Sequence, residues 1–415
     1  MRSPVPEYLA SVLKDCRAFD GGTVTEGNPE VASADPETFA VALATVGGSL
    51  HGAGDTDTAF SIQSIAKAIA YALAIEDNGI EAVLEAVDVE PSGDSFNEIS
   101  LEAETGRPRN PLINAGALAV HSMIRGGGSE ERARRITDLL SRMAGRELSI
   151  DRAVYEAELE SDDRNTAIAH LLKSVGHLGA EPAEVVDGYA RQCAVKVTCN
   201  DLARIAAVLA NGGEDPETGA QILDPAIDRH VLAVMATCGM YDGSGSWLAS
   251  VGIPAKSGVA GAIIGVLPGQ VGIAVVSPRL NEHGNSVRGV AVFERLSHDL
   301  GLHMMHVAPS GESSIRSVTE AEDVTSVELQ GDLRFAGAEA VISRLWAEVT
   351  ENWSVTIDFK EVRAVDGAAR RLLTEAVRAL EDDGHRVSVE DPDGFMDSPD
   401  RSEATGENHV PVGQR

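Results

Sequence analysis

Ser64 and Lys67 are the residues of this sequence best suited by type and spacing to nucleophilic chemistry. They lie in the segment FSIQSIAK, and an apolar stretch continues from there to Gly79. This stretch predicts a helix that ends near Gly79, and positions three residues apart share a helix face. The only charged residue at positions 61–75 is Lys67. Apolar surroundings lower the pKa of a lysine, so its neutral amine could accept the proton of the Ser64 hydroxyl. The alternative is a surface serine beside a solvent-reaching lysine.

A second motif, KSGV at residues 256–259, favours the catalytic interpretation. It is similar to the Lys-Thr-Gly strand motif that accompanies Ser-x-x-Lys in serine β-lactamases and penicillin-binding proteins. Apolar runs at 263–267 and 272–277 follow it, and the turn-forming Pro-Gly-Gln between them predicts an antiparallel hairpin. In such an arrangement the backbone N–H groups of Ser64 and Val259 would form an oxyanion hole. The alternative here is a turn glycine with a lysine nearby.

Six ordered motifs resemble those of the serine-dependent glutaminases, which have a β-lactamase-like fold. The resemblance covers about residues 6–305 and implies an L-glutamine amidohydrolase that needs no metal or organic cofactor. It also implies a homo-oligomer, commonly a dimer or tetramer. The motifs are FSIQSIAK (60–67), EPSGDSFN (90–97), NPLINAGAL (110–118), YEAELESDDRN (155–165), CGMYDGSG (238–245) and PAKSGVAG (254–261).

The resemblance implies a role for each residue that matches a family position. Ser64 would be the nucleophile, Lys67 its general base, and Tyr241 a relay of protons to the leaving ammonia. The implied substrate-binding residues are Gln63, Ser64, Asn114, Glu158, Asn165, Tyr189, Tyr241 and Val259.

The chemistry of these residue types fits glutamine. A carboxylate such as Glu158 suits the α-ammonium group, and neutral donors such as Asn114 and Tyr189 suit the α-carboxylate. Gln63 would help to position the same end of the substrate. Without the resemblance, Glu158 and Asn165 would be read as part of a solvated helix face.

One position departs from the family pattern. The family commonly has a tyrosine in Gly-Lys-Val-Ala-Asp-Tyr-Ile-Pro, where this chain reads Gly-Thr-Val-Thr-Glu-Gly-Asn-Pro at residues 22–29. Gly27 therefore stands at the tyrosine position. Loss of that phenol is expected to reduce affinity or rate while leaving nucleophile and base in place.

The secondary structure predicted along the chain suggests that two units position these residues. Residues 1–305 alternate helical and β-branched stretches, which predicts an α/β (α+β) catalytic domain. We expect a linker at 306–325, a small α/β domain at 326–390 and a disordered acidic tail at 391–415. The small domain has predicted strands at 326–329, 354–359 and 385–389 and predicted helices at 337–349 and 367–381.

Two segments of the second unit, residues 327–335 and IDFKEVRAVDGAARRLL at 357–373, resemble those of a STAS domain. Members that switch by phosphorylation carry Asp-Ser-Ser-Gly at the start of a helix, whereas residues 366–369 here read Asp-Gly-Ala-Ala. Without a hydroxyl there, docking of a protein partner or a structural role is favoured over a phospho-switch. Two arrangements stay open: an independent unit, or one packed as an obligate part of the oligomer.

Composition narrows the classes of function. The 415 residues include 34 Lys and Arg against 65 Asp and Glu, a net charge of −31, which disfavours binding to nucleic acid or anionic membranes. Four cysteines without a Cys-x-x-Cys pair indicate neither a disulfide framework nor a zinc site. The first ten residues lack the pattern of a signal peptide, and no apolar run is long enough to span a bilayer, so we expect a cytoplasmic protein.

The sequence thus predicts a glutaminase that forms a covalent γ-glutamyl ester on Ser64. Two other functions stay open. One is a penicillin-binding-protein-like serine hydrolase, which the absence of an export signal disfavours. The other is a catalytically weak glutamine sensor that acts through its STAS domain, which Gly27 makes conceivable.

Overall fold

The computed structural model describes residues 3–93, 100–306, 313–321, 324–349 and 354–397. The chain divides into two compact units, Met1–His306 and Val307–Arg415.

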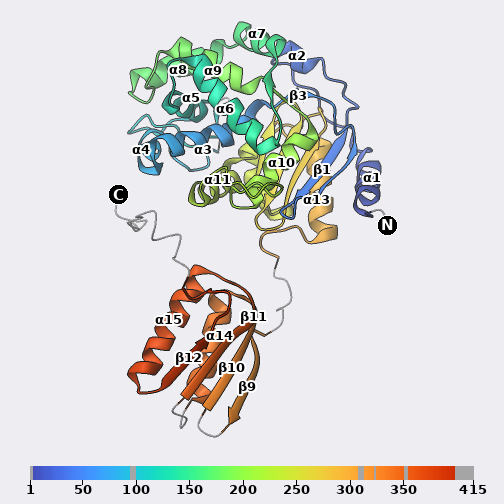
Figure 1. Ribbon diagram of the computed structural model, residues 1–415. Coiled ribbons are helices and arrows are strands. Elements are labelled where there is room, and N and C mark those ends of the chain that lie inside the picture. Colours follow the sequence, from blue (N-terminus) through green and yellow to red (C-terminus); the bar gives the residue numbers. More distant parts are fainter. Residues whose placement is uncertain (1–2, 94–99, 307–312, 322–323, 350–353, 398–415) are drawn as a thin grey trace. The chain divides into compact units, whose positions relative to one another are not determined.

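The first unit is built on a five-stranded antiparallel sheet in the order β2-β1-β8-β7-β6 (Figure 1). The hairpin expected after the KSGV motif is confirmed, because β7 and β8 pair antiparallel directly after β6. The strands are β1 (Ala40–Thr45), β2 (Leu50–Gly54), β6 (Ala255–Gly258), β7 (Ala262–Leu267) and β8 (Val271–Val276).

Both faces of this sheet are buried, which explains why its central strands read as continuous apolar runs. Alternate residues point to opposite faces, so Val41 and Leu43 pack with helices α1 and α13, whereas Ala42 packs on the side of α10. Figure 1 shows α1 and α13 on one side of the sheet and α10 on the other. On the α10 side β1 contributes only alanines, Ala40, Ala42 and Ala44, and a Cβ on Gly272 of β8 would lie 2.2 Å from the backbone nitrogen of Ala207 in α10. The helix backbone therefore rests directly on the strand.

The remaining helices form a second layer around α3 and carry most of the predicted site residues. The helices are α1 (Val5–Cys16), α2 (Pro29–Ala32), α3 (Ala66–Asn78), α4 (Ile80–Ala86), α5 (Asn114–Met123), α6 (Ser129–Ala144), α7 (Arg152–Glu160), α8 (Asp163–Ser174), α9 (Pro182–Cys193), α10 (Cys199–Ala210), α11 (Pro225–Cys238), α12 (Ser244–Ser250) and α13 (Val287–Leu300), with 3-10 turns η1 (Gln63–Ile65) and η2 (Tyr241–Gly243). A small sheet joins β3 (Phe60–Ser61), β5 (Val195–Val197) and β4 (Ser149–Ile150) in that order.

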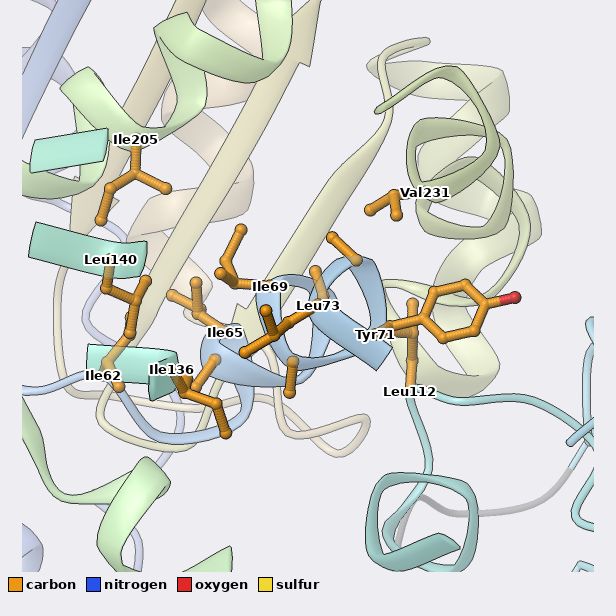
Figure 2. Close-up of a cluster of buried hydrophobic side chains, with 14 of the residues drawn as sticks. Ile62, Ile65, Ile69, Tyr71, Leu73, Leu112, Ile136, Leu140, Ile205 and Val231 are labelled. Carbon is orange, nitrogen blue, oxygen red and sulfur yellow. The ribbon is translucent and has the colours of Figure 1, made fainter. Parts of the chain in front are cut away.

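Helix α3 is buried on all sides, which anchors the Ser64 segment rigidly. Figure 2 shows Ile65, Ile69 and Leu73 of this region among side chains of α6, α10 and α11, including Ile136 and Val231. As the sequence predicts, the helix ends at Gly79, which has φ 82° as its C-cap. A helix without an exposed face cannot rotate or shift without repacking the core, so its first turn is held in place.

The second unit is a four-stranded sheet in the order β12-β11-β10-β9, in which β10, β11 and β12 are parallel and β9 is antiparallel. Alternate residues of β10 and β11 are buried and share a core with both helices, which therefore cover one face. The elements are β9 (Ile315–Ala321), β10 (Val324–Leu333), α14 (Phe335–Glu348), β11 (Ser354–Val365), α15 (Gly367–Asp382) and β12 (Arg386–Glu390).

Two expectations for this unit were wrong in part. Strand β9 lies inside the predicted linker of residues 306–325, where polar residues on an edge strand hid its pairing with β10. The predicted tail of residues 391–415 begins with packed structure, since Phe395 and Met396 contact the core and the Phe395 carbonyl accepts a hydrogen bond from Arg370. The remainder of that segment, from residue 398, lies outside the described residues.

Candidate active site

Ser64 lies in the 3-10 turn that leads into helix α3, and its side chain is buried. Gln63, directly before it, has φ 51°, and Tyr241 has φ 58°. In the described parts of the chain these are the only residues other than glycine in the left-handed region, where a side chain costs free energy. Both strained residues are ones that the sequence predicted for the site. The Nε2 atom of Gln63 donates to Ser61 Oγ at 3.1 Å, which fixes the turn further.

Lys67, in the first turn of α3, is 1% exposed. Its Nζ atom donates to Asn114 Oδ1 at 2.6 Å and to the Leu112 carbonyl at 3.3 Å. Burial lowers the pKa of Lys67 to about 8, against the opposing effects of Cys193 and Glu158. The expected direct meeting with the Ser64 hydroxyl is not seen as a hydrogen bond between these described residues. The amine is instead held by two acceptors beside the serine turn.

Three substrate-binding candidates form a connected group next to this lysine. The Nδ2 atom of Asn114 donates to Asn165 Oδ1 at 3.0 Å, and the Tyr189 hydroxyl donates to Asn114 Oδ1 at 3.4 Å. The Nζ atom of Lys67 lies 5.9 Å from the centre of the Tyr189 ring. Helices α5, α8 and α9 therefore bring together residues that are up to 75 positions apart in the sequence.

Glu158, on helix α7, accepts a hydrogen bond of 2.8 Å from Asn28 Nδ2. Burial raises the pKa of Glu158, while Asn28 and the positive charge of Lys67 oppose that rise. Asn28 is buried and also caps helix α2. The segment that contains Gly27 therefore lies against the candidate site. Sequence reasoning missed Asn28 itself, although its place beside Gly27 was the available signal.

Tyr241, in the 3-10 turn η2, adjoins Ser64. Its hydroxyl is hydrogen-bonded with the Ser64 side chain and donates to the Ser257 carbonyl at 3.1 Å. Burial raises the pKa of Tyr241, so the phenol stays protonated. Lys256 Nζ lies 4.2 Å from the centre of the Tyr241 ring, and burial together with Lys67 lowers the pKa of Lys256.

Val259 follows directly after strand β6, which packs against the Ser64 turn. A Cβ on the preceding Gly258 would lie 3.2 Å from the Ile62 carbonyl and 3.6 Å from the Gln63 side chain. Glycine thus permits the close approach that brings the KSGV segment and the serine turn together. Of the remaining predicted motifs, EPSGDSFN lies partly outside the described residues.

A surface hollow of about 430 Å³ lies near the candidate site. It is lined by residues 23–26, Asp242 and residues 280–284. Asp242 directly follows Tyr241, and residues 23–26 directly precede Gly27 and Asn28. The hollow is therefore next to two segments that build the site.

The family model described as "Glutaminase" matches residues 22–305. The chain belongs to the glutaminase family. The model described as "Mlab, STAS domain" matches residues 317–399, so a C-terminal STAS domain follows the glutaminase domain. Both fold predictions, a β-lactamase-like α/β domain and a small α/β STAS domain, are confirmed.

Similar proteins match either the whole chain or its first unit. The glutaminase of Corynebacterium glutamicum is 46% identical over 395 residues, covering 95% of each chain. That of Trichormus variabilis is 45% identical over 303 residues, covering 72% of this chain and 91% of its own. A crystal structure of Mglu in its glutamate form has a TM-score of 0.87 at 44% identity, covering 95% of this chain and 99% of that one.

The described residues of this glutaminase-family chain contain no group of three or more His, Cys, Asp or Glu side chains placed to hold a metal ion. None of the helices within those residues is long and apolar enough to cross a membrane.

Proposed function

We propose that this hydrolase of the glutaminase family converts L-glutamine and water to L-glutamate and ammonia, with Ser64 as the nucleophile. The observation that carries the proposal is Lys67, which is buried in the first turn of the helix entered through Ser64. With a pKa of about 8, about a tenth of its amine is neutral at pH 7, far more than for a lysine with the ordinary pKa of about 10.4. A neutral amine can act as the general base that a serine nucleophile needs.

The proposed reaction has two halves. Ser64 Oγ attacks the side-chain amide carbon of glutamine while its proton passes to Lys67, and the backbone N–H groups of Ser64 and Val259 hold the oxyanion. Collapse of the tetrahedral intermediate breaks the C–N bond, and Tyr241 relays a proton to the leaving ammonia. Water then attacks the γ-glutamyl ester, which releases glutamate and restores the Ser64 hydroxyl. The hydrogen bond of Tyr241 with Ser64 supports this assignment.

The other end of the substrate would meet the amide and carboxylate groups of the site. Glu158 is assigned to the α-ammonium group, because it is a partly buried carboxylate within electrostatic reach of Lys67. Asn114 and Tyr189 are assigned to the α-carboxylate, while Asn165 and Gln63 position them and the substrate. The hydrogen bonds of Asn114 with both Asn165 and Tyr189 support a common role for these residues in binding the α-carboxylate end of the substrate.

An ammonia-release assay on the purified full chain tests this function. It compares glutamine, asparagine and a chromogenic β-lactam as substrates. Release of ammonia from glutamine alone is expected. Hydrolysis of the β-lactam would favour a penicillin-binding-protein-like hydrolase, and binding of glutamine without turnover would favour a sensor.

The STAS domain is proposed to dock a protein partner rather than to switch by phosphorylation. Asp366 accepts a hydrogen bond of 2.7 Å from the Ala369 backbone and thereby caps α15. Residues 367–369, Gly-Ala-Ala, offer no hydroxyl to a kinase. We also propose a homo-oligomer, a dimer or tetramer, which sedimentation of the full chain would test.

A further inference from the structure

Asp162 is a buried carboxylate to which the mechanism above gives no role. It lies between helices α7 and α8 and is 8% exposed. Its carboxyl group accepts a hydrogen bond from the Asn165 side chain, but its Oδ2 atom has no hydrogen-bond partner among the described residues. A buried oxygen without a donor costs free energy, so such an atom needs a reason.

The neighbours of Asp162 place it in the substrate site. The charge of Glu158 on α7 acts on Asp162, and the charge of Asp162 acts on Tyr189 and Cys193 of α9. All three neighbours lie around Lys67. Asn165, its hydrogen-bond partner, is itself bonded to Asn114. The carboxyl group therefore adjoins several of the groups that surround the substrate head group.

A directed series of hydrogen bonds also joins Asp162 to the candidate base. Lys67 donates to Asn114, Asn114 donates to Asn165, and Asn165 donates to the Asp162 carboxyl group. Each amide in this series is thus held in one orientation. The donor from Asn165 occupies one side of the Asp162 carboxyl group. The Oδ2 atom has no donor among the described residues and can accept a hydrogen bond from another group.

We propose that Asp162 is a second carboxylate of the substrate site, which together with Glu158 binds the α-ammonium group of the amino-acid substrate. This proposal rests on the function proposed above for Glu158. The ammonium group carries three N–H donors, so it can satisfy both carboxylates at once. It would also place a positive charge beside both carboxylates.

The groups around Asp162 imply that ligand binding at this carboxylate depends on pH. Burial and the negative charge of Glu158 raise the pKa of Asp162 to about 7, with Asp163 acting in the same direction and Asn165 opposing it. Tyr189 and Cys193, whose pKa values are also raised by burial, stay neutral at that pH. A bound ammonium group favours the charged carboxylate, so ligand binding near pH 7 should expel a proton from Asp162.

Calorimetric titration of the full chain with L-glutamate tests the proposal without depending on catalysis. L-Glutamate carries the same head group as glutamine and is not turned over. At pH 7 the wild type should release protons on binding, seen as a heat that changes with the ionisation enthalpy of the buffer. Asp162→Asn should bind about tenfold more weakly, as expected for loss of a charge-assisted hydrogen bond, and should release fewer protons.

The chain offers a matched control in Asp228. This carboxylate on α11 is 3% exposed, its Oδ1 atom lacks a partner within the described parts, and its pKa is raised to about 7. Asp228→Asn should leave both the affinity and the proton release unchanged. The proposal is overturned if Asp162→Asn binds glutamate as the wild type does, or if both variants lose the same affinity. Failure of the wild type to release ammonia from glutamine would instead overturn the proposed function alone.

Discussion

The Nζ atom of Lys67 lies 2.6 Å from the Oδ1 atom of Asn114. This contact orients the amine, while burial lowers the pKa of Lys67 to about 8. The lysine is thus both fixed in position and easily deprotonated. These are the two properties that a general base near neutral pH requires.

The pH dependence of kcat/KM should follow the titration of Lys67. The base must be neutral, so kcat/KM should rise with pH through about 8 and then level off. Asn114→Asp adds a negative charge beside the amine, which favours the ammonium form and should move this limb to higher pH. Asn78→Asp, at the other end of α3, is the control and should leave the limb in place. An unshifted limb in Asn114→Asp would argue against Lys67 as the base.

Glu158→Gln should raise KM for glutamine. Charge-assisted hydrogen bonds contribute about 1.5–3 kcal/mol, which corresponds to a rise of roughly tenfold to a hundredfold. N-acetylglutamine, which lacks the ammonium group, should be a poor substrate for the wild type. The control is Glu156→Gln, an exposed position on the same helix, where KM should not change. Equal hydrolysis of the acetylated and free amino acids would remove the assigned role from Glu158.

Gly27→Tyr should restore the phenol that the family commonly places here and should therefore lower KM or raise kcat. The site can accept a side chain, because a Cβ on Gly27 would meet only the Thr25 hydroxyl, at 3.8 Å. Its neighbour Asn28 bonds Glu158, so the new ring would be near the substrate head group. Steady-state kinetics should show no such gain for Gly21→Tyr, where a Cβ meets nothing within 4 Å. A Gly27→Tyr variant with wild-type kinetics would show that the missing phenol is irrelevant in this chain.

The sequence was most informative where a physical pattern was local. The helix after Ser64 and its end at Gly79 follow from an apolar stretch and a glycine cap, and the β7–β8 hairpin follows from its turn. Strand β9 was missed because an edge strand with several exposed residues shows no apolar run.

The site was less accessible to sequence reasoning because its contacts are non-local. Asn28 and Glu158 are 130 residues apart, and nothing in either segment indicates their hydrogen bond. Asp162 belongs to the YEAELESDDRN motif, but only tertiary packing buries it beside Glu158 and leaves one of its oxygens without a hydrogen-bond donor among the described residues. The resemblance supplied residue positions, whereas the burial that sets their pKa values needed the structure.

Truncation after residue 308 should leave a soluble and active enzyme. All predicted catalytic residues lie between Ser64 and Val259, inside the first compact unit. The match to the glutaminase of Trichormus variabilis covers 72% of this chain and 91% of that protein. A relative of about the size of the first unit therefore exists without most of the second unit. Activity and sedimentation of residues 1–308 are the measurements. An insoluble or inactive fragment would show instead that the STAS domain is an obligate part of the assembly.

Ammonia release from glutamine by purified Ser64→Ala tests the central claim most directly. Ser122→Ala, a buried serine on the neighbouring helix α5, is the matched control and should keep its activity. The account predicts that Ser64→Ala loses at least about a thousandfold in kcat, as expected when a nucleophile is removed, while its circular dichroism stays that of the wild type. A folded Ser64→Ala variant that retains turnover within about tenfold of the wild type would contradict Ser64 as the nucleophile.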